Sequence, residues 1–336
     1  MELYLPVIWA VLIAVAVAMY VILDGFDLGI GILFPTARQE PERDQMMNSV
    51  APFWDGNETW LVLGGGGLWV AFPKAYAVIM PAFYLPVIVM LLALIFRGVS
   101  FEFRFVSKPR HRLWDVAFFA GSTIAAFAQG IILGGLIQGV TVVDGRFAGG
   151  PFDWATPFAL LAGIGMVAGY ALLGATWLIA KTDGPLAARA RGQARALLIL
   201  VLLFIAAVSL WTPLGFERIA ARWFSTPNIY FLWPVPLVTA ALAWLVWRSL
   251  AAGREVLPFI GVVGLFVLSY LGLAISTFPY LVPPTLTVWD TAAVPDSQIF
   301  TLIGTVIMLP IILGYFVFVF WTFRAKVSAG AEGGYH

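Results

Sequence analysis

The chain has 336 residues, of which 61% are hydrophobic and only 11% are charged, and its mean hydropathy is +0.94. A soluble domain carries about 25% charged residues, so this composition indicates a protein that crosses a membrane several times. The absence of cysteine excludes disulfides, thiolate metal sites and iron–sulfur clusters. The formal net charge of +1 does not indicate a class of partner, and we expect no nucleic-acid partner.

About 20 apolar residues are enough to cross the hydrocarbon core of a bilayer. The sequence predicts nine such helices, at residues 5–33, 49–72, 75–97, 114–140, 155–180, 194–215, 229–249, 256–279 and 299–323. The first segment lacks the basic start of a secretory signal, so we expect it to be retained as a helix. The connecting segments are short, and residues 1–336 are therefore expected to form a single all-α integral membrane domain.

The basic residues predict how the chain is oriented. Of the 19 Lys and Arg residues, those that would lie on the side of the N-terminus are Lys74, Arg146, Arg218 and Arg222. All the others fall on the opposite side of the predicted membrane. Because Lys and Arg are enriched in cytoplasmic loops, the N-terminus is expected outside and the C-terminus in the cytoplasm.

Four carboxylates interrupt the first two apolar segments. Asp24 and Asp27 are three residues apart in the first segment, and Asp55 and Glu58 have the same spacing in the second. A charge at the centre of a membrane helix costs about 2.5–3.5 kcal/mol on insertion scales and marks a functional site by default. At 1.5 Å per residue, both pairs lie about 10–15 Å from the cytoplasmic ends of their helices. These neighbouring pairs predict a route for protons or cations.

A purely structural role is the alternative for these acids. Asp55 and Glu58 could hydrogen-bond Asn57, Trp60 or a neighbouring helix and only fix the packing. Asp27 lies closer to the end of its helix, where a carboxylate can simply face water or lipid headgroups.

Arg97 and Glu102 follow the third apolar segment, in the run FRGVSFEFR (Phe96–Arg104). Residues at such a position are most often anchors at the membrane interface. An ion pair or an anion-binding role is the alternative for Arg97.

Haem ligation by this chain is not expected. An axial ligand is usually a His, Met, Cys or Tyr held inside a helix. The two histidines are His111, in a basic loop, and His336, the last residue. Embedded methionines are far more often packing residues than ligands. The sequence therefore predicts neither a haem nor a metal ion bound by this chain.

Several motifs together resemble subunit II of the cytochrome bd-type quinol oxidases. They are DGFDLGIG (Asp24–Gly31), NSVAPFWDGNETWL (Asn48–Leu61), FRGVSFEFR (Phe96–Arg104), LWDVAFFAGS (Leu113–Ser122) and LTVWDTAA (Leu286–Ala293). The similarity covers essentially the whole chain in order. Glu58 stands where the enteric branch often has Gln, and this residue with the short loops is more similar to the cyanide-insensitive branch.

The resemblance implies nine helices, arranged as two four-helix bundles plus one peripheral helix. It implies a complex in the bacterial cytoplasmic (inner) membrane that oxidises quinol and reduces dioxygen to water, with protons taken from the cytoplasm. Haem b and haem d would belong to the partner, subunit I. The resemblance also allows a small single-helix subunit and a structural quinone, with lipid around the complex.

The matching motifs also imply site residues. The proton path would include the carboxylates Asp55, Glu58, Asp24 and Asp27. The flanking or supporting residues would be Trp54, Asn57, Arg97 and Glu102. The competing hypothesis is a stand-alone proton-coupled transporter, which commonly shows inverted repeats and broken helices. No clear repeat is present in the sequence.

Overall fold

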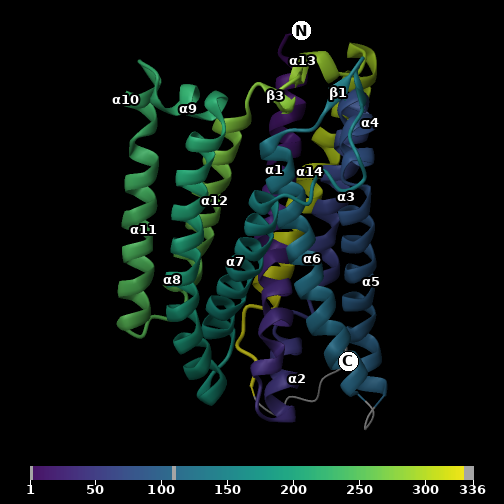
Figure 1. The fold of residues 1–336 in the computed structure, drawn as a ribbon. Coiled ribbons are helices and arrows are strands. Elements are labelled where there is room, and N and C mark those ends of the chain that lie inside the picture. Colours follow the sequence, from purple (N-terminus) through teal and green to yellow (C-terminus); the bar gives the residue numbers. More distant parts are fainter. Residues whose placement is uncertain (1–2, 108–110, 329–336) are drawn as a thin grey trace.

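The computed structural model of the chain describes residues 3–107 and 111–328, which form a tall bundle of helices (Figure 1). Its longer helices are α1 (Leu5–Leu33), α3 (Trp54–Ala71), α5 (Tyr84–Val106), α6 (Arg112–Gln138), α7 (Pro157–Lys181), α8 (Gly184–Gly215), α11 (Pro234–Ala251), α12 (Leu257–Thr277) and α14 (Pro295–Thr322). The short helices are η1 (Phe34–Thr36), α2 (Glu40–Asn48), α4 (Pro73–Ala82), α9 (Glu217–Phe224), α10 (Asn228–Leu232) and α13 (Val288–Thr291). Two small antiparallel hairpins pair β1 (Val142–Val143) with β2 (Arg146–Phe147), and β3 (Tyr280–Val282) with β4 (Leu286–Thr287).

The all-α membrane fold expected from the sequence is confirmed. In the described residues, eight helices are long and apolar enough to cross a membrane. The helix predicted at 49–72 corresponds to α3, which is not among the eight because polar residues fill its first two turns. The prediction was wrong for 75–97, where the structure has two helices, α4 and α5, that meet at Phe83. Pro86 lacks the N–H that would bond the carbonyl of Ala82, so a continuous helix is interrupted there.

The long helices pack in two groups. One group contains α1, α3, α5 and α6, and the other contains α7, α8, α11 and α12. Helix α14 packs against α1 and α3. The two groups meet where α7 lies against α1 and α6 (Figure 1). This grouping is the one that the resemblance implies.

Helices α1 and α7 approach each other so closely that their backbones touch. A Cβ added at Gly29 would lie 1.9 Å from the carbonyl oxygen of Tyr170, and one added at Gly174 would lie 2.4 Å from the carbonyl carbon of Gly29. Small residues permit such contacts between membrane helices. The contact fixes α7 beside the polar part of α1.

We expect Gly29→Ala to lower the midpoint of thermal unfolding. The added methyl group must push backbone away from backbone, and overpacking typically costs about 1–3 kcal/mol. Gly192→Ala, in α8, is the matched control because a Cβ there meets nothing within 4 Å. Since Ala is the better helix former, the control should keep or slightly raise the midpoint. Equal midpoints for the two variants would contradict the close contact.

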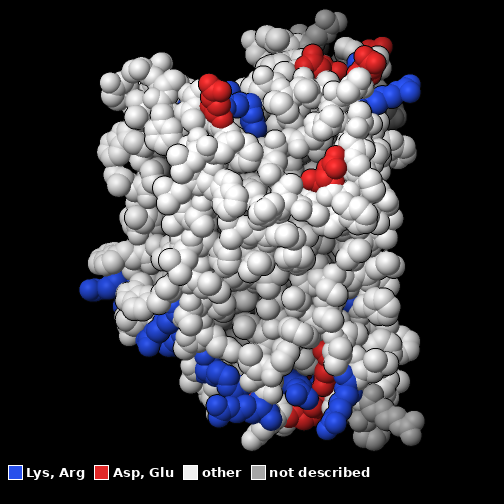
Figure 2. All heavy atoms as spheres, in the orientation of Figure 1, with Lys and Arg blue, Asp and Glu red and all other residues white. Residues whose placement is uncertain are grey.

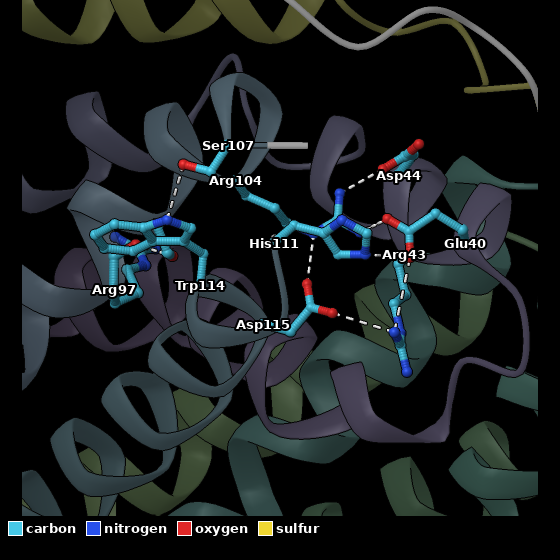
Figure 3. A network of polar contacts seen from close by, with 10 residues as sticks. Glu40, Arg43, Asp44, Arg97, Arg104, Ser107, His111, Trp114 and Asp115 are labelled. Carbon is cyan, nitrogen blue, oxygen red and sulfur yellow. Dashed lines mark hydrogen bonds and ion pairs between the residues drawn. The ribbon is translucent and has the colours of Figure 1, made fainter. Parts of the chain in front are cut away.

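One end of the molecule is rich in charge. Figure 2 shows Lys and Arg side chains gathered mainly at the lower end of this face, the end that carries α2 in Figure 1. Arg104 anchors this end: its buried guanidinium pairs with Glu40 and Asp44 of α2, and its Nε donates a hydrogen bond to Asp115 of α6 at 2.7 Å (Figure 3). The network ties α2 to α5 and α6.

Glu42 of α2 forms a second tie at this end. Its two carboxylate oxygens accept hydrogen bonds of 2.8 and 2.9 Å from Arg189 of α8, and one of them also accepts from the backbone N–H of Arg38. The hydrogen bonds from Arg189 are the main cause that lowers the pKa of Glu42 to about 2. The stability that ionised Glu42 gains from these hydrogen bonds is therefore fully present above the ordinary pKa of about 4.5, and it is lost as the pH falls towards 2.

We expect Arg189→Gln to lower the unfolding midpoint slightly at pH 7, since a surface ion pair contributes at most about 1 kcal/mol. The difference from the unmodified protein should shrink as the pH falls from about 5 to 3, because Glu42 is then protonated in the unfolded chain. Thermal unfolding at pH 7, 5, 4 and 3 measures it. A difference that grows towards low pH would contradict the assignment.

Candidate functional site

Arg97 of α5 is the centre of a buried cluster of charges. Its side chain is fully buried. Its guanidinium nitrogens lie 3.0 Å from Asp24 Oδ1, 3.7 Å from Asp27 Oδ2 and 2.9 Å from Glu58 Oε1. The two aspartates are also fully buried, whereas the side chain of Glu58 is 29% exposed. Three carboxylates from α1 and α3 thus converge on one cation.

Helix geometry explains why these residues meet. Asp24 and Asp27 are three residues apart and therefore share one face of α1. Helices α1 and α3 pack side by side, so this face meets the first turns of α3. Arg97 reaches both helices from α5, and its guanidinium lies 5.4 Å from the ring centroids of Trp54 and Phe101. The two aromatic rings stack with a centroid distance of 4.9 Å and hold the arginine between α3 and α5.

Asn57 fixes the position of Asp27. Its amide nitrogen donates to Asp27 Oδ2 at 2.6 Å and to the backbone carbonyl of Leu23 at 3.2 Å. Within the described chain, no group bonds the remaining oxygen of Asp24, Asp27 or Asn57, although all three atoms are buried. Buried polar atoms are rarely left without a partner, so these oxygens retain the capacity to accept a proton or a hydrogen bond.

The cluster has a formal charge of −2 when all three carboxylates are ionised, because one arginine faces three acids. In a low-dielectric environment such an excess of negative charge attracts a proton or another cation strongly. The arrangement is therefore suited to taking up and passing on protons. It would be a poor choice for packing alone, since apolar side chains would fill the same space at lower cost.

A groove lies next to this cluster, on the surface of the molecule at the start of α3. Its volume is about 690 Å³, and it lies between the start of α3, the end of α5 and α14. Asp55, Asn57 and Glu102 are its polar lining residues, and the rest of its wall is largely aromatic or aliphatic. Asp55 and Glu102 are exposed, and Asn57 is shared between the groove and the buried cluster. The groove and the cluster therefore meet at Asn57.

The structure separates the predicted site residues into two sets. Asp24, Asp27 and Glu58 come together at Arg97, with Asn57 and Trp54 beside them. Asp55 and Glu102 lie on the groove instead, and neither makes an ion pair with a described residue. The ion-pair alternative for Arg97, rather than the interface anchor, is the one that the structure supports.

Sequence reasoning missed three polar residues beside the cluster: Tyr20, Gln129 and Tyr170. Tyr20 precedes Asp24 by four residues on α1, so it lies on the same helical face and could have been found by that spacing. Gln129 is one of two amides, with Gln138, in the apolar segment 114–140. Tyr170 could not be distinguished by sequence from the packing aromatics around it.

The structure describes one of the two histidines of the chain. His111 Nε2 lies 3.1 Å from Glu40 in the network around Arg104 (Figure 3), and His336 falls outside the described residues. The atoms of Glu40, His111 and Asp115 lie within 4.8 Å of one another, close enough for a metal site. Arg43 and Arg104 already pair with both of these carboxylates, so the group is better described as an ion-pair network.

The family model described as cytochrome bd terminal oxidase subunit II matches residues 5–323. The chain belongs to this family. It is similar to the cytochrome bd-I ubiquinol oxidase subunit 2 of Escherichia coli K12, with 33% identity that covers 96% of this chain and 94% of the relative. It is also similar to the cytochrome bd ubiquinol oxidase subunit 2 of Bacillus subtilis, with 28% identity that covers 96% of each chain.

A solved structure of the bd oxidase from Geobacillus thermodenitrificans has the same fold, with a TM-score of 0.75 and 18% identity over 95% of this chain and 98% of that one. Membership of the family confirms that the chain is a subunit of an oxidoreductase complex, as the resemblance implied. It also speaks against the stand-alone transporter.

Proposed function

We propose that this chain is the non-haem subunit II of a cytochrome bd-type quinol:oxygen oxidoreductase, and that it supplies part of the path by which protons reach the site of oxygen reduction. The observation that carries the proton role is the burial of three carboxylates around Arg97 beside a groove that opens to the surface. The reaction in this proposal is inferred from the family to which the chain belongs.

The partner in this proposal is subunit I, which would hold haem b and haem d and oxidise the quinol. The relatives from Escherichia coli and Bacillus subtilis are named as ubiquinol oxidase subunits, which supports a quinol as electron donor. The complex would lie in the bacterial cytoplasmic membrane, with the charged end that carries α2 in the cytoplasm. The enrichment of Lys and Arg at this end supports that orientation (Figure 2).

Protons would enter through the groove. Asp55 and Glu102 would attract them at its exposed part, and Glu58 would receive them because it is the only member of the described cluster with a partly exposed side chain. Asp24 and Asp27 would take the proton further inward. Arg97 holds all three acceptors within 4 Å of one cation, so a proton can be transferred among them with little movement of the helices.

The exposed face of α3 has features that favour contact with a partner subunit. Asp55, Gly65 and Gly66 are exposed on α3. Helix α3 packs beside the apolar helix α14. An aspartate facing lipid is costly, whereas glycines let a second helix approach closely. We infer that subunit I packs on this face of α3, beside the groove through which the protons enter.

The test is to purify the chain with an affinity tag from its native membrane and to record the reduced-minus-oxidised spectrum. Haem b and haem d bands, with a second large membrane subunit in the same fraction, are expected. A colourless chain that elutes alone after gentle extraction would contradict the proposal.

A further inference from the structure

Three polar side chains form a hydrogen-bonded chain that ends at the buried cluster. Tyr170 of α7 donates its hydroxyl to Gln129 Oε1 of α6 at 2.6 Å, and Gln129 Nε2 donates to the hydroxyl oxygen of Tyr20 on α1 at 2.9 Å. Both tyrosines are buried, with 0% and 4% of their surface exposed. The chain links three helices through groups that apolar residues could have replaced.

The chain has a direction. Because the oxygen of Tyr20 accepts a hydrogen bond from Gln129, its own hydrogen remains free for another acceptor. Tyr20 precedes Asp24 by four residues on α1 and therefore lies on the same face of the helix, and Asp24 Oδ2 is buried and accepts no hydrogen bond within the described residues. Each hydroxyl or amide group therefore donates towards Asp24. Hydrogen bonds aligned in this way polarise one another and strengthen the last donor.

We propose that Gln129 and Tyr170 are positioning residues that hold the Tyr20 hydroxyl as a hydrogen-bond donor to Asp24. This inference rests on the proposed proton path. Asp24 already faces Arg97, and the other charged groups around it are Asp27 on its own helix and Glu58 on α3. Arg97 is shared among three carboxylates, so Tyr20 adds a donor that belongs to Asp24 alone.

Gln129 has a specific task in this arrangement. If its amide were reversed, its oxygen would face Tyr20 and would attract the hydroxyl hydrogen away from Asp24. The hydrogen bond from Tyr170 to Gln129 Oε1 favours the orientation in which the amide nitrogen faces Tyr20. Tyr170 thus acts on Asp24 through two other residues, and its effect should be smaller than that of Tyr20.

The experiment compares Tyr20→Phe, Tyr170→Phe and Tyr270→Phe in the assembled oxidase, with haem content checked in each. The readout is the pH profile of quinol-dependent oxygen consumption. In Tyr20→Phe, the fall in turnover on the acid side should begin about one pH unit higher, since the charged form of Asp24 has lost a donor. Tyr170→Phe should shift the profile in the same direction by less. Tyr270 makes no hydrogen bond within the described residues, and its variant should match the unmodified enzyme.

A Tyr20→Phe profile identical to that of Tyr270→Phe would overturn the inference. Glu58→Gln, measured in parallel, then separates two cases. Lowered turnover in Glu58→Gln would leave the proton path in place without a role for Tyr20, whereas normal turnover would remove the path itself. In Asp24→Asn, the added Tyr20→Phe change should have no further effect on the profile, because the two groups act as one unit. A full additional shift in the double variant would also overturn the inference.

Discussion

Arg97→Gln is expected to abolish most of the folded protein that can be extracted from the membrane. The change leaves Asp24, Asp27 and Glu58 facing one another without a cation, and two of these carboxylates are fully buried. Breaking a buried ion pair by removing one partner costs about 3–5 kcal/mol, which is a large part of the stability of an ordinary domain. Yield of monodisperse protein on size-exclusion chromatography, followed by thermal unfolding, measures the loss.

Two comparisons make this prediction specific. Arg104 lies seven residues further along α5 and also binds three acids, but those acids are 12–34% exposed. Water can stabilise them after Arg104→Gln, so that variant should be affected less. Adding Asp27→Asn to Arg97→Gln removes one of the unpaired charges and should recover part of the yield. If Arg97→Gln alone folds as well as the unmodified protein, the carboxylates do not depend on this cation.

The membrane fold and the presence of acids within apolar helices could both be predicted from the sequence, because both signals are local. A carboxylate within an apolar run is visible without any structure, and three-residue spacing places a pair on one helical face. The role of Arg97 is not visible in this way. It depends on α5 packing beside α1 and α3, and an arginine near the end of an apolar segment is usually an anchor.

The helix boundaries also depend on features that an apolar run of sequence does not reveal. An apolar run predicts a span, but the interruption at Phe83 depends on a missing backbone donor at Pro86, and both halves remain apolar. Helix α2 was not predicted because it has only nine residues and most of them are polar. It is held by ion pairs of Asp44 with Arg104 on α5 and of Glu42 with Arg189 on α8, two helices that are distant in the sequence.

Asp55 and Glu58 illustrate how the structure refines a spacing argument. Both were expected in one route, and three residues on an α-helix separate two side chains by about 60° around the axis. That rotation is enough to turn Glu58 towards Arg97 and Asp55 towards the groove. The sequence placed Asp55 first among the proton-path residues, and in the structure Asp55 lines the groove, Asn57 links the groove to Asp27, and Glu58 pairs with Arg97.

Glu58→Gln is therefore expected to lower the turnover of the assembled oxidase by about tenfold or more, because positioned proton-transfer groups typically contribute at least that much. Asp55→Asn should also lower turnover, but by a smaller factor, since Glu102 lies on the same groove and can still attract protons. Both variants should keep their haem content, because neither removes the cation of the cluster. Asp144→Asn, at the turn between β1 and β2, is the matched control and should not change turnover.

The order of these effects tests the direction of the route. A larger loss in Asp55→Asn than in Glu58→Gln would mean that protons pass Asp55 without using the Arg97 cluster. Loss of haem in either variant would instead favour the structural role of the acids. Unchanged turnover in both would exclude this face of α3 as the entrance. A loss that is greatest at Glu58 is the outcome that requires Arg97, Asp24 and Asp27 to act beyond the groove.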